Sequence, residues 1–78
     1  MSVTVRLYAG VKEAAGAAQL TVDGATVGEV REAAAAACPP IADQLRYCRF
    51  AMDDTFVDAD APVADGAVVD AIPPVSGG

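Results

Sequence analysis

The spacing of hydrophobic residues changes its period along this chain, and that change limits the folds available to it. Val3, Val5 and Leu7 alternate with polar residues up to Ala9, and a second alternating run covers residues 18–23. A period of two is typical of a strand with one buried face. Because the two runs are close in sequence, we expect them to pair as a hairpin. The segment 11–16 between them is long enough for only about one helical turn before a glycine ends it.

A helical pattern follows, and it begins at Thr26. Thr26 and Glu29 have the spacing of a capping box, in which two side chains bond free amides of the first turn. Apolar residues then recur at near-helical spacing up to Pro39-Pro40, where a helix cannot continue. The sequence therefore predicts one main helix that starts at about Thr26 and stops before the proline pair.

The second half of the chain contains several short segments. Residues 41–47 are compatible with either a loop or a partial helical turn, whereas 49–52 and 55–57 are predicted strands around a turn at Asp53-Asp54. Residues 67–72 form a last predicted strand. This order predicts an α+β fold of the β-grasp, or ubiquitin-like, type, with a mixed sheet of four or five strands. In that topology the first and last strands lie parallel at the sheet centre.

The end of the chain differs from the predicted β-grasp domain, which we assign to residues 1–72. Residues 73–78 begin with two prolines, which fix φ and lack N–H donors, so the segment should leave the sheet as an extended tail. Gly77 and Gly78 can pass through a channel too narrow for side chains, and Gly78 offers a carboxylate. A frayed terminus is the alternative interpretation. We expect the reaction at Gly78 with Gly77 beside it, and partner contacts from Ile72, Pro73, Pro74, Val75 and Ser76.

Composition argues against several classes of function. Eleven acidic and five basic residues give a net charge of −6, which disfavours nucleic acid and membrane surfaces and favours a basic protein surface as partner. The chain has no histidine, and Cys38 and Cys48 lack metal-ligand spacing, so we expect no metal site and no catalytic triad. No signal-like or membrane-spanning run is present. We therefore expect a cytoplasmic protein with two buried thiols rather than a disulfide.

Four segments together resemble one family. They are Val-Arg-Leu-Tyr-Ala-Gly-Val-Lys-Glu-Ala-Ala-Gly, Thr-Val-Gly-Glu-Val, Val-Ala-Asp-Gly-Ala-Val-Val-Asp and the terminal Ile-Pro-Pro-Val-Ser-Gly-Gly. Over essentially its whole length the chain resembles the MoaD family, the small subunits of molybdopterin synthase, within the MoaD/ThiS group of ubiquitin-fold sulfur carriers. The Pro-Pro-Val-Ser-Gly-Gly terminus is the most specific element, because thiamine-pathway carriers of this fold are usually shorter and end in Gly-Gly without the proline pair.

The resemblance implies a sulfur carrier that is not an enzyme on its own. A ubiquitin-activating-like adenylyltransferase would use ATP to form an acyl-adenylate at Gly78, and a sulfur donor would convert this to a thiocarboxylate. In the MoaD family the thiocarboxylate gives its sulfur to the pterin precursor of the molybdenum cofactor, in a pocket of the large subunit of molybdopterin synthase. We expect no bound cofactor. The chain offers no acid, base or phosphate loop of its own, which agrees with this role.

Three other functions remain open from the sequence. The sulfur could go to another acceptor, such as the thiazole of thiamine or cysteine; the chain could be a ubiquitin-like modifier that links Gly78 to lysines; or it could be a passive interaction module.

Asp70 also departs from the family, whose members often carry bulky residues in the last strand before the prolines. Because Asp70 alternates with Val68 and Ile72, we expect its charge to be exposed or to face a partner.

Overall fold

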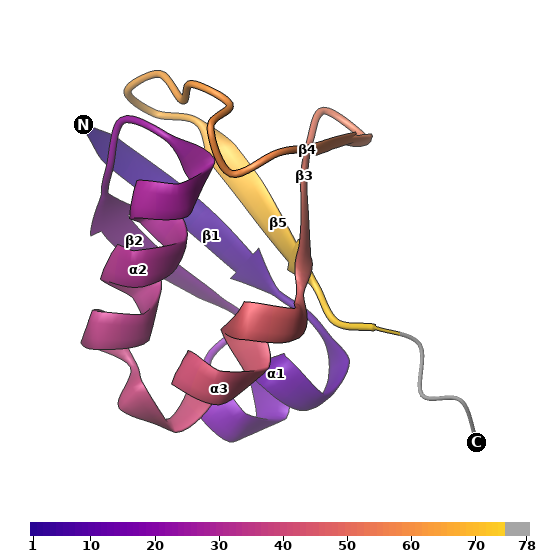
Figure 1. The fold of residues 1–78 in the computed structure, drawn as a ribbon. Helices are drawn as coiled ribbons and strands as arrows, with labels where there is room; N and C mark the ends of the chain where they lie inside the picture. The colour runs from indigo at the N-terminus through magenta and orange to yellow at the C-terminus, as the bar shows by residue number, and fades with distance from the viewer. Residues whose placement is uncertain (75–78) are drawn as a thin grey trace.

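The computed structural model describes residues 1–74 and places the core between one sheet and the helices packed on it (Figure 1). β1 and β5 are parallel neighbours, and the other adjacent strands are antiparallel. The strand order is β2-β1-β5-β3-β4. This confirms the predicted β-grasp fold, with the first and last strands at the sheet centre. The strands are β1 (Ser2–Leu7), β2 (Gln19–Asp23), β3 (Arg49–Met52), β4 (Thr55–Val57) and β5 (Val68–Ile72).

The first two strands form the predicted antiparallel pair, joined by helix α1 (Ala9–Ala15). The prediction that the first strand extends to Ala9 is wrong. Ala9 has a φ of 48° and opens the helix, so β1 ends at Leu7. Gly16 ends α1 as expected, since its φ of 70° suits a residue without a Cβ.

Helix α2 (Val27–Ala37) is the main helix and begins where the capping box predicts. The Thr26 hydroxyl accepts a hydrogen bond from the Glu29 amide at 3.2 Å. The Glu29 carboxylate accepts one from the Ala25 amide at 3.0 Å, one residue before the expected position. Val30 and Ala34 are fully buried on the inner side of the helix. The small residues of this side let α2 lie close against the sheet.

Residues 41–47, where the sequence left loop and helix open, are helical together with the proline pair before them. They form the 3-10 turn η1 (Pro39–Ile41) and helix α3 (Ala42–Tyr47). Ile41 and Leu45 are four residues apart, and both are almost completely buried. They are the largest fully buried side chains in a core otherwise built mainly of valine and alanine.

Two connections complete the body. Asp53 and Asp54 have positive φ values of 51° and 63° and form the predicted turn between β3 and β4. The loop after β4 then crosses the start of α2. In this loop Ala61 O accepts a hydrogen bond from the Val27 amide, and the Val63 amide donates one to Ala25 O, both at 3.0 Å. The helix is thereby fixed at its first turn to the segment that leads into β5.

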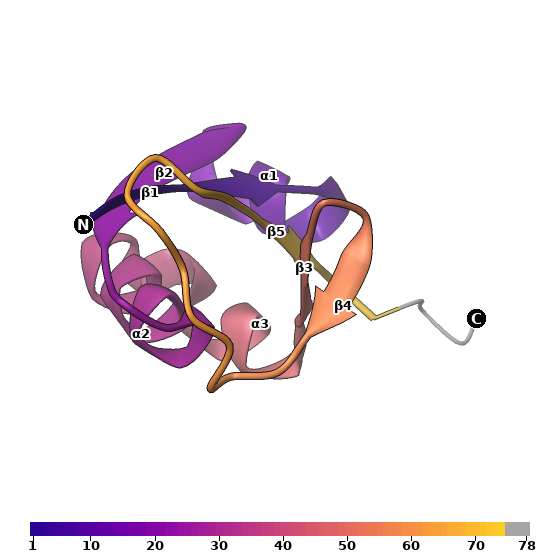
Figure 2. The ribbon, with the colours of Figure 1, turned by 90° about the horizontal axis from the view of Figure 1, so that it is seen from above.

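The two faces of the sheet differ in what covers them. Helices α2 and α3 lie on one side of the sheet, as the view from above shows (Figure 2). Core residues such as Val5, Val69 and Phe50 point to that side. We call the opposite surface the open face. Alternation and pairing register place on it the side chains of Ser2, Thr4, Arg6, Gln19, Thr21, Asp23, Arg49, Ala51, Phe56, Val68, Asp70 and Ile72.

Candidate functional site

The tail starts from the centre of the sheet. β5 is paired with β1 on one side and with β3 on the other, and Arg49 pairs with its last residue, Ile72. Figure 1 shows β5 leaving the sheet at the end opposite to the N-terminus. Ile72 and Pro73 are half-buried and Pro74 is exposed. We call these three residues the tail root, and a strand held on both sides gives it a rigid base.

The structure describes only part of the predicted site. Among the expected partner-binding residues, Ile72 is the last residue of β5, and Pro73 and Pro74 follow it outside any strand, as the proline pair predicts. Four predicted site residues lie outside the described residues, and their roles stay predictions: Val75, Ser76, Gly77 and Gly78.

Asp70 is buried, so the prediction of an exposed or partner-facing charge in preference to a buried one is wrong. Only 8% of the residue is accessible. Arg6 lies directly opposite on β1, where its Nε donates to Asp70 Oδ1 at 2.6 Å and its Nη2 donates to Oδ2 at 3.0 Å. The Tyr8 hydroxyl also donates to Oδ1, at 2.8 Å. These two long side chains cover the carboxylate, which explains why an outward-pointing aspartate is shielded from water. We call the three residues the Asp70 cluster.

The Asp70 cluster keeps its carboxylate ionised. Hydrogen bonding from Arg6 lowers the pKa of Asp70, burial opposes this, and the Tyr8 hydrogen bond lowers the pKa further. The same hydrogen bond to Asp70 raises the pKa of the Tyr8 hydroxyl, and burial adds to that effect. At neutral pH the cluster therefore consists of a carboxylate, a guanidinium and a neutral phenol.

Around the tail root the open face carries large exposed side chains. Tyr8 and Phe56 are 40% and 50% accessible, whereas Val68, which is 42% accessible, lies at the far end of β5. The guanidinium carbon of Arg49 lies 3.7 Å from the centroid of the Phe56 ring, which is a cation–π contact. Exposed aromatic and arginine side chains next to an exit strand are typical of a surface that binds another protein.

Four residues of this surface carry no motif that marks them in the sequence: Arg6, Tyr8, Arg49 and Phe56. One signal was present: Arg6 and Asp70 both occupy outward positions of the two strands predicted to lie side by side. Opposite charges at such positions favour a cross-strand pair. The register that brings them together is a property of the folded sheet, and it was needed to identify the pair.

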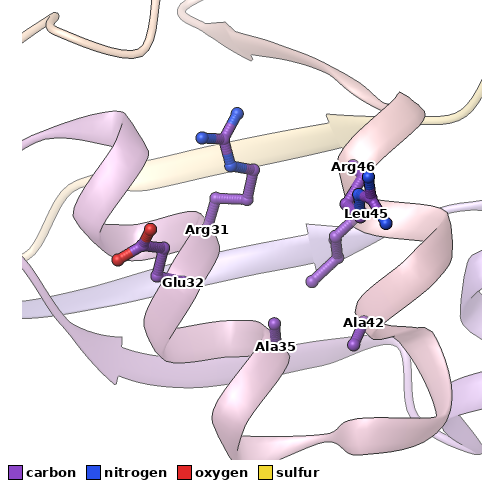
Figure 3. A pocket seen from close by; sticks show the side chains of 6 residues that line it. All are labelled: Arg31, Glu32, Ala35, Ala42, Leu45 and Arg46. Atoms are coloured by element: carbon purple, nitrogen blue, oxygen red, sulfur yellow. The ribbon is translucent and has the colours of Figure 1, made fainter.

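A shallow cavity of about 330 Å³ between α2 and α3 is a weaker candidate (Figure 3). It lies on the helical side of the molecule, and α2 and α3 line it with arginine, glutamate, alanine and leucine side chains. None of these is a nucleophile, and β5 does not contribute to it. The cavity is therefore separate from the tail root. Its lining residues are Arg31, Glu32, Ala35, Ala42, Leu45 and Arg46.

The two cysteines are free, as predicted, although they are half-buried rather than fully buried. Cys48 Sγ donates to Gln44 O at 3.3 Å, and burial raises the pKa of this thiol, which disfavours the reactive thiolate. Within residues 1–74 no three His, Cys, Asp or Glu side chains gather as metal ligands. In the same range no helix is long and apolar enough to cross a membrane.

Comparison with known proteins decides the family. Residues 5–78 match the ThiS family over the β-grasp body and the tail. The chain belongs to the ThiS family. A comparison with curated proteins finds no match.

Solved structures similar to this ThiS-family chain represent more than one biological setting. SAMP1 from Haloferax volcanii is 26% identical, with a TM-score of 0.89 and complete coverage of both chains. A chain in the complex of subunits 1 and 2 of the molybdopterin-converting factor from Helicobacter pylori is 28% identical, with a TM-score of 0.73 and complete coverage. A chain in the BexX/CysO complex from Amycolatopsis orientalis is 25% identical, with a TM-score of 0.81, and the match covers 97% of this chain and 99% of that one.

Proposed function

We propose that this chain is the sulfur-carrying subunit of a molybdopterin synthase. The observation that carries the proposal is the joining of a Pro-Pro-Val-Ser-Gly-Gly segment directly to the central strand β5. The full-length likeness to a chain in the molybdopterin-converting factor complex supports a large subunit as the partner.

The chemistry of the proposal takes place at the carboxyl group of Gly78. A carboxylate is a poor electrophile, because its charge repels nucleophiles and oxide is a poor leaving group. A ubiquitin-activating-like adenylyltransferase would join this carboxylate to the AMP moiety of ATP, with release of pyrophosphate. A sulfur donor would then displace AMP and leave a thiocarboxylate. That group is an ionised, soft nucleophile, and it would deliver its sulfur to the pterin precursor held by the large subunit.

The body of the chain would act as a handle in this scheme rather than as a catalyst. The hydrogen-bonded β5 would set the direction in which the tail enters a partner's pocket. The glycine pair would then reach reacting groups inside a narrow channel, and all acid–base and phosphate-binding groups would come from the partners.

Mass spectrometry tests the proposal directly. The chain would be produced together with its adenylyltransferase and a sulfur donor, and intact mass would be measured. We expect the mass increase of one oxygen-to-sulfur exchange, located in the C-terminal peptide. Incubation with the large subunit and the pterin precursor should then remove the increase.

Two variants serve as controls. Deletion of Gly78 removes the acyl group that is activated, so no sulfur should be incorporated. Gly77→Val places a β-branched side chain beside the reacting residue and should strongly reduce incorporation, since it fits neither a narrow channel nor positive φ. A normal sulfur increment on the Gly78-deleted protein would contradict the assignment.

A second candidate is a ubiquitin-like modifier, which the likeness to small archaeal modifier protein 1 favours. In that case the activated Gly78 would form isopeptide bonds with lysine amines instead of accepting sulfur. Lys12 is the only lysine of the chain and is exposed on α1. Side-chain-linked chains of this protein with itself would therefore all pass through Lys12. Conjugates in cell extracts that carry Gly78 on lysine, together with an absent thiocarboxylate, would support this second candidate.

A further inference from the structure

We propose that Arg6 and Arg49 form a cationic anchor on the open face that binds carboxylates on the partner protein beside the tail root. This inference rests on the proposed function, because the partner to which it commits is the large subunit. It refines the expectation from net charge alone, which favours a basic partner surface.

The Asp70 cluster is an asymmetric ion pair, and this asymmetry exposes positive charge. The side chain of Asp70 is 11% accessible, whereas that of Arg6 is 51% accessible. Two nitrogens of Arg6, Nε and Nη2, hold the carboxylate. Among residues 1–74 no further hydrogen bond is formed by its third nitrogen, Nη1, whose two N–H groups can bind an acceptor from outside. The carboxylate of Asp70 is therefore buried, and the guanidinium of Arg6 is exposed to a partner.

The hydrogen bonds also fix Arg6 in place before any partner arrives. Its fork-shaped pairing with Asp70 holds the guanidinium plane, and Tyr8 holds the same carboxylate from a second direction. An arginine that is already ordered loses less side-chain freedom on binding than a free one. Arg6 is therefore suited to bind a carboxylate with defined geometry.

Arg49 provides the second cation of the anchor. It pairs with Ile72, on the other side of β5 from Arg6, and its guanidinium stacks on the exposed ring of Phe56. The two arginines thus stand one strand to either side of β5, about 12 Å apart at the backbone from two strand spacings and a two-residue offset along the strands. Arg49 lies at the level where the chain leaves the sheet, and Arg6 lies two residues before it.

The open face carries two carboxylates, Asp70 and Asp23, and Asp23 stands opposite Ser2, four residues along β1 from Arg6. Asp70 is the only carboxylate in β1, β3, β4 and β5, and it is already paired. Asp54, in the β3–β4 turn, also helps to raise the pKa of Arg6 through its charge, after the larger effect of the hydrogen bond to Asp70. At about 0.1 M salt, exposed charges farther than roughly 10 Å are largely screened. A docked partner would therefore meet two arginines at short range, despite the net charge of −6.

The test is isothermal titration calorimetry of the full chain with the recombinant large subunit from the same organism. Arg49→Gln removes one anchor cation. The double variant Arg6→Gln/Asp70→Asn removes the other together with its buried partner, so that no unpaired carboxylate remains and the net charge stays at −6. We expect each to weaken binding by about 5- to 30-fold, the range of a substantial interface contact.

Arg46→Gln is the matched control, since it changes net charge as Arg49→Gln does but removes an exposed side chain of α3, on the other side of the sheet. It should leave Kd unchanged, and Kd of the wild type should rise with salt more steeply than that of the anchor variants. Anchor variants that bind as tightly as the Arg46→Gln control would overturn this inference and leave the proposed function standing. A wild-type chain that does not bind the large subunit would overturn both.

Discussion

Asp70 is the residue whose environment most affects how the tail is held. Its carboxylate accepts three hydrogen bonds from Arg6 and Tyr8, and it lies two residues before the tail root. Strand pairing joins β1 and β5 through the backbone, and the Asp70 cluster adds a side-chain connection between them on the open face. Stability and presentation of the tail therefore share the same groups.

The lowered pKa of Asp70 makes part of the stability depend on pH. A carboxyl group whose pKa is lower in the folded state stabilises the fold above its unfolded pKa of about 3.9, and this stabilisation is lost as pH falls through the folded pKa. We expect Asp70→Asn to lower the free energy of unfolding at pH 7 by about 1 kcal/mol. The difference from wild type should shrink as pH falls below about 4. Urea unfolding across this pH range measures it.

Asp43→Asn is the control for this pH dependence. Asp43 pairs with Arg46 at 3.6 Å, but both side chains are strongly exposed, and such pairs add little stability. Its unfolding curves should match those of wild type at every pH. If the free energy of unfolding of Asp70→Asn stayed below that of wild type by the same amount down to the lowest pH, lost packing and not lost charge would explain the difference.

The cysteines should be dispensable for sulfur chemistry. Burial raises the pKa of Cys48, and the proposed reactive sulfur is attached to the Gly78 acyl carbon. We expect the Cys38→Ala/Cys48→Ala variant to form the thiocarboxylate normally, with a loss of stability on the order of 1 kcal/mol. Intact mass and urea unfolding give the two readouts. A folded variant without sulfur incorporation would indicate a persulfide relay through one of these thiols.

At the scale of the elements, the passage from β2 into α2 depends on a glycine. A Cβ added at Gly24 would lie 2.8 Å from Val30 Cγ2 and 2.9 Å from the Val30 backbone nitrogen. Val30 is itself fully buried and bonded to Thr26 O, so it has little room to move. The close approach of this connection to α2 therefore requires a residue without a side chain.

Gly24→Ala should destabilise the protein by about 1–3 kcal/mol, because the added methyl group overpacks the start of α2. Gly10→Ala is the matched control: its Cβ would meet nothing nearer than 4.0 Å, at Gln44 Oε1, and it lies in α1. That change should stabilise by roughly 0.5–1 kcal/mol, from helix propensity. Thermal or urea unfolding shows whether each change lowers or raises the free energy of unfolding. Equal effects of the two changes would contradict the packing described for Gly24.

At the scale of the whole molecule, the body of the chain contains the hydrophobic core, and the proposed chemistry belongs to the tail. The hydrophobic core is formed by residues between Val3 and Ala71, and the tail root lies beyond it. The stability of the fold and the proposed chemistry are thus assigned to different parts of the chain. A variant that lacks the tail should therefore lose the proposed chemistry and keep the stability of the fold.

Deletion of residues 75–78 tests this division. We expect the free energy of unfolding to stay within about 0.5 kcal/mol of wild type, as for changes remote from a core. Sulfur incorporation should be lost completely. Urea unfolding and intact mass of the same preparation provide both values, and a large loss of stability would show that the tail contributes to the fold.

Local sequence patterns were sufficient for most of the elements. The alternation of Val3, Val5 and Leu7 predicted a half-buried strand, the Thr26 and Glu29 pair predicted the helix start, and Asp53-Asp54 predicted a tight turn. Each of these signals depends on residues a few positions apart, so the sequence contains it directly. The order of the elements then restricted the topology to the β-grasp.

Long-range pairing decided the remainder. Residues 41–47 gave no clear pattern, because Ile41 and Leu45 become core residues only where α3 meets the sheet and α2. Asp70 was predicted to be exposed from its alternation alone, since alternation gives the face of a strand but not what lies beside it. The parallel register of β1 and β5 places Arg6 opposite Asp70, 64 positions away in sequence. Only the tertiary structure brings such distant side chains together, and their contact determines which charge is buried and which is presented.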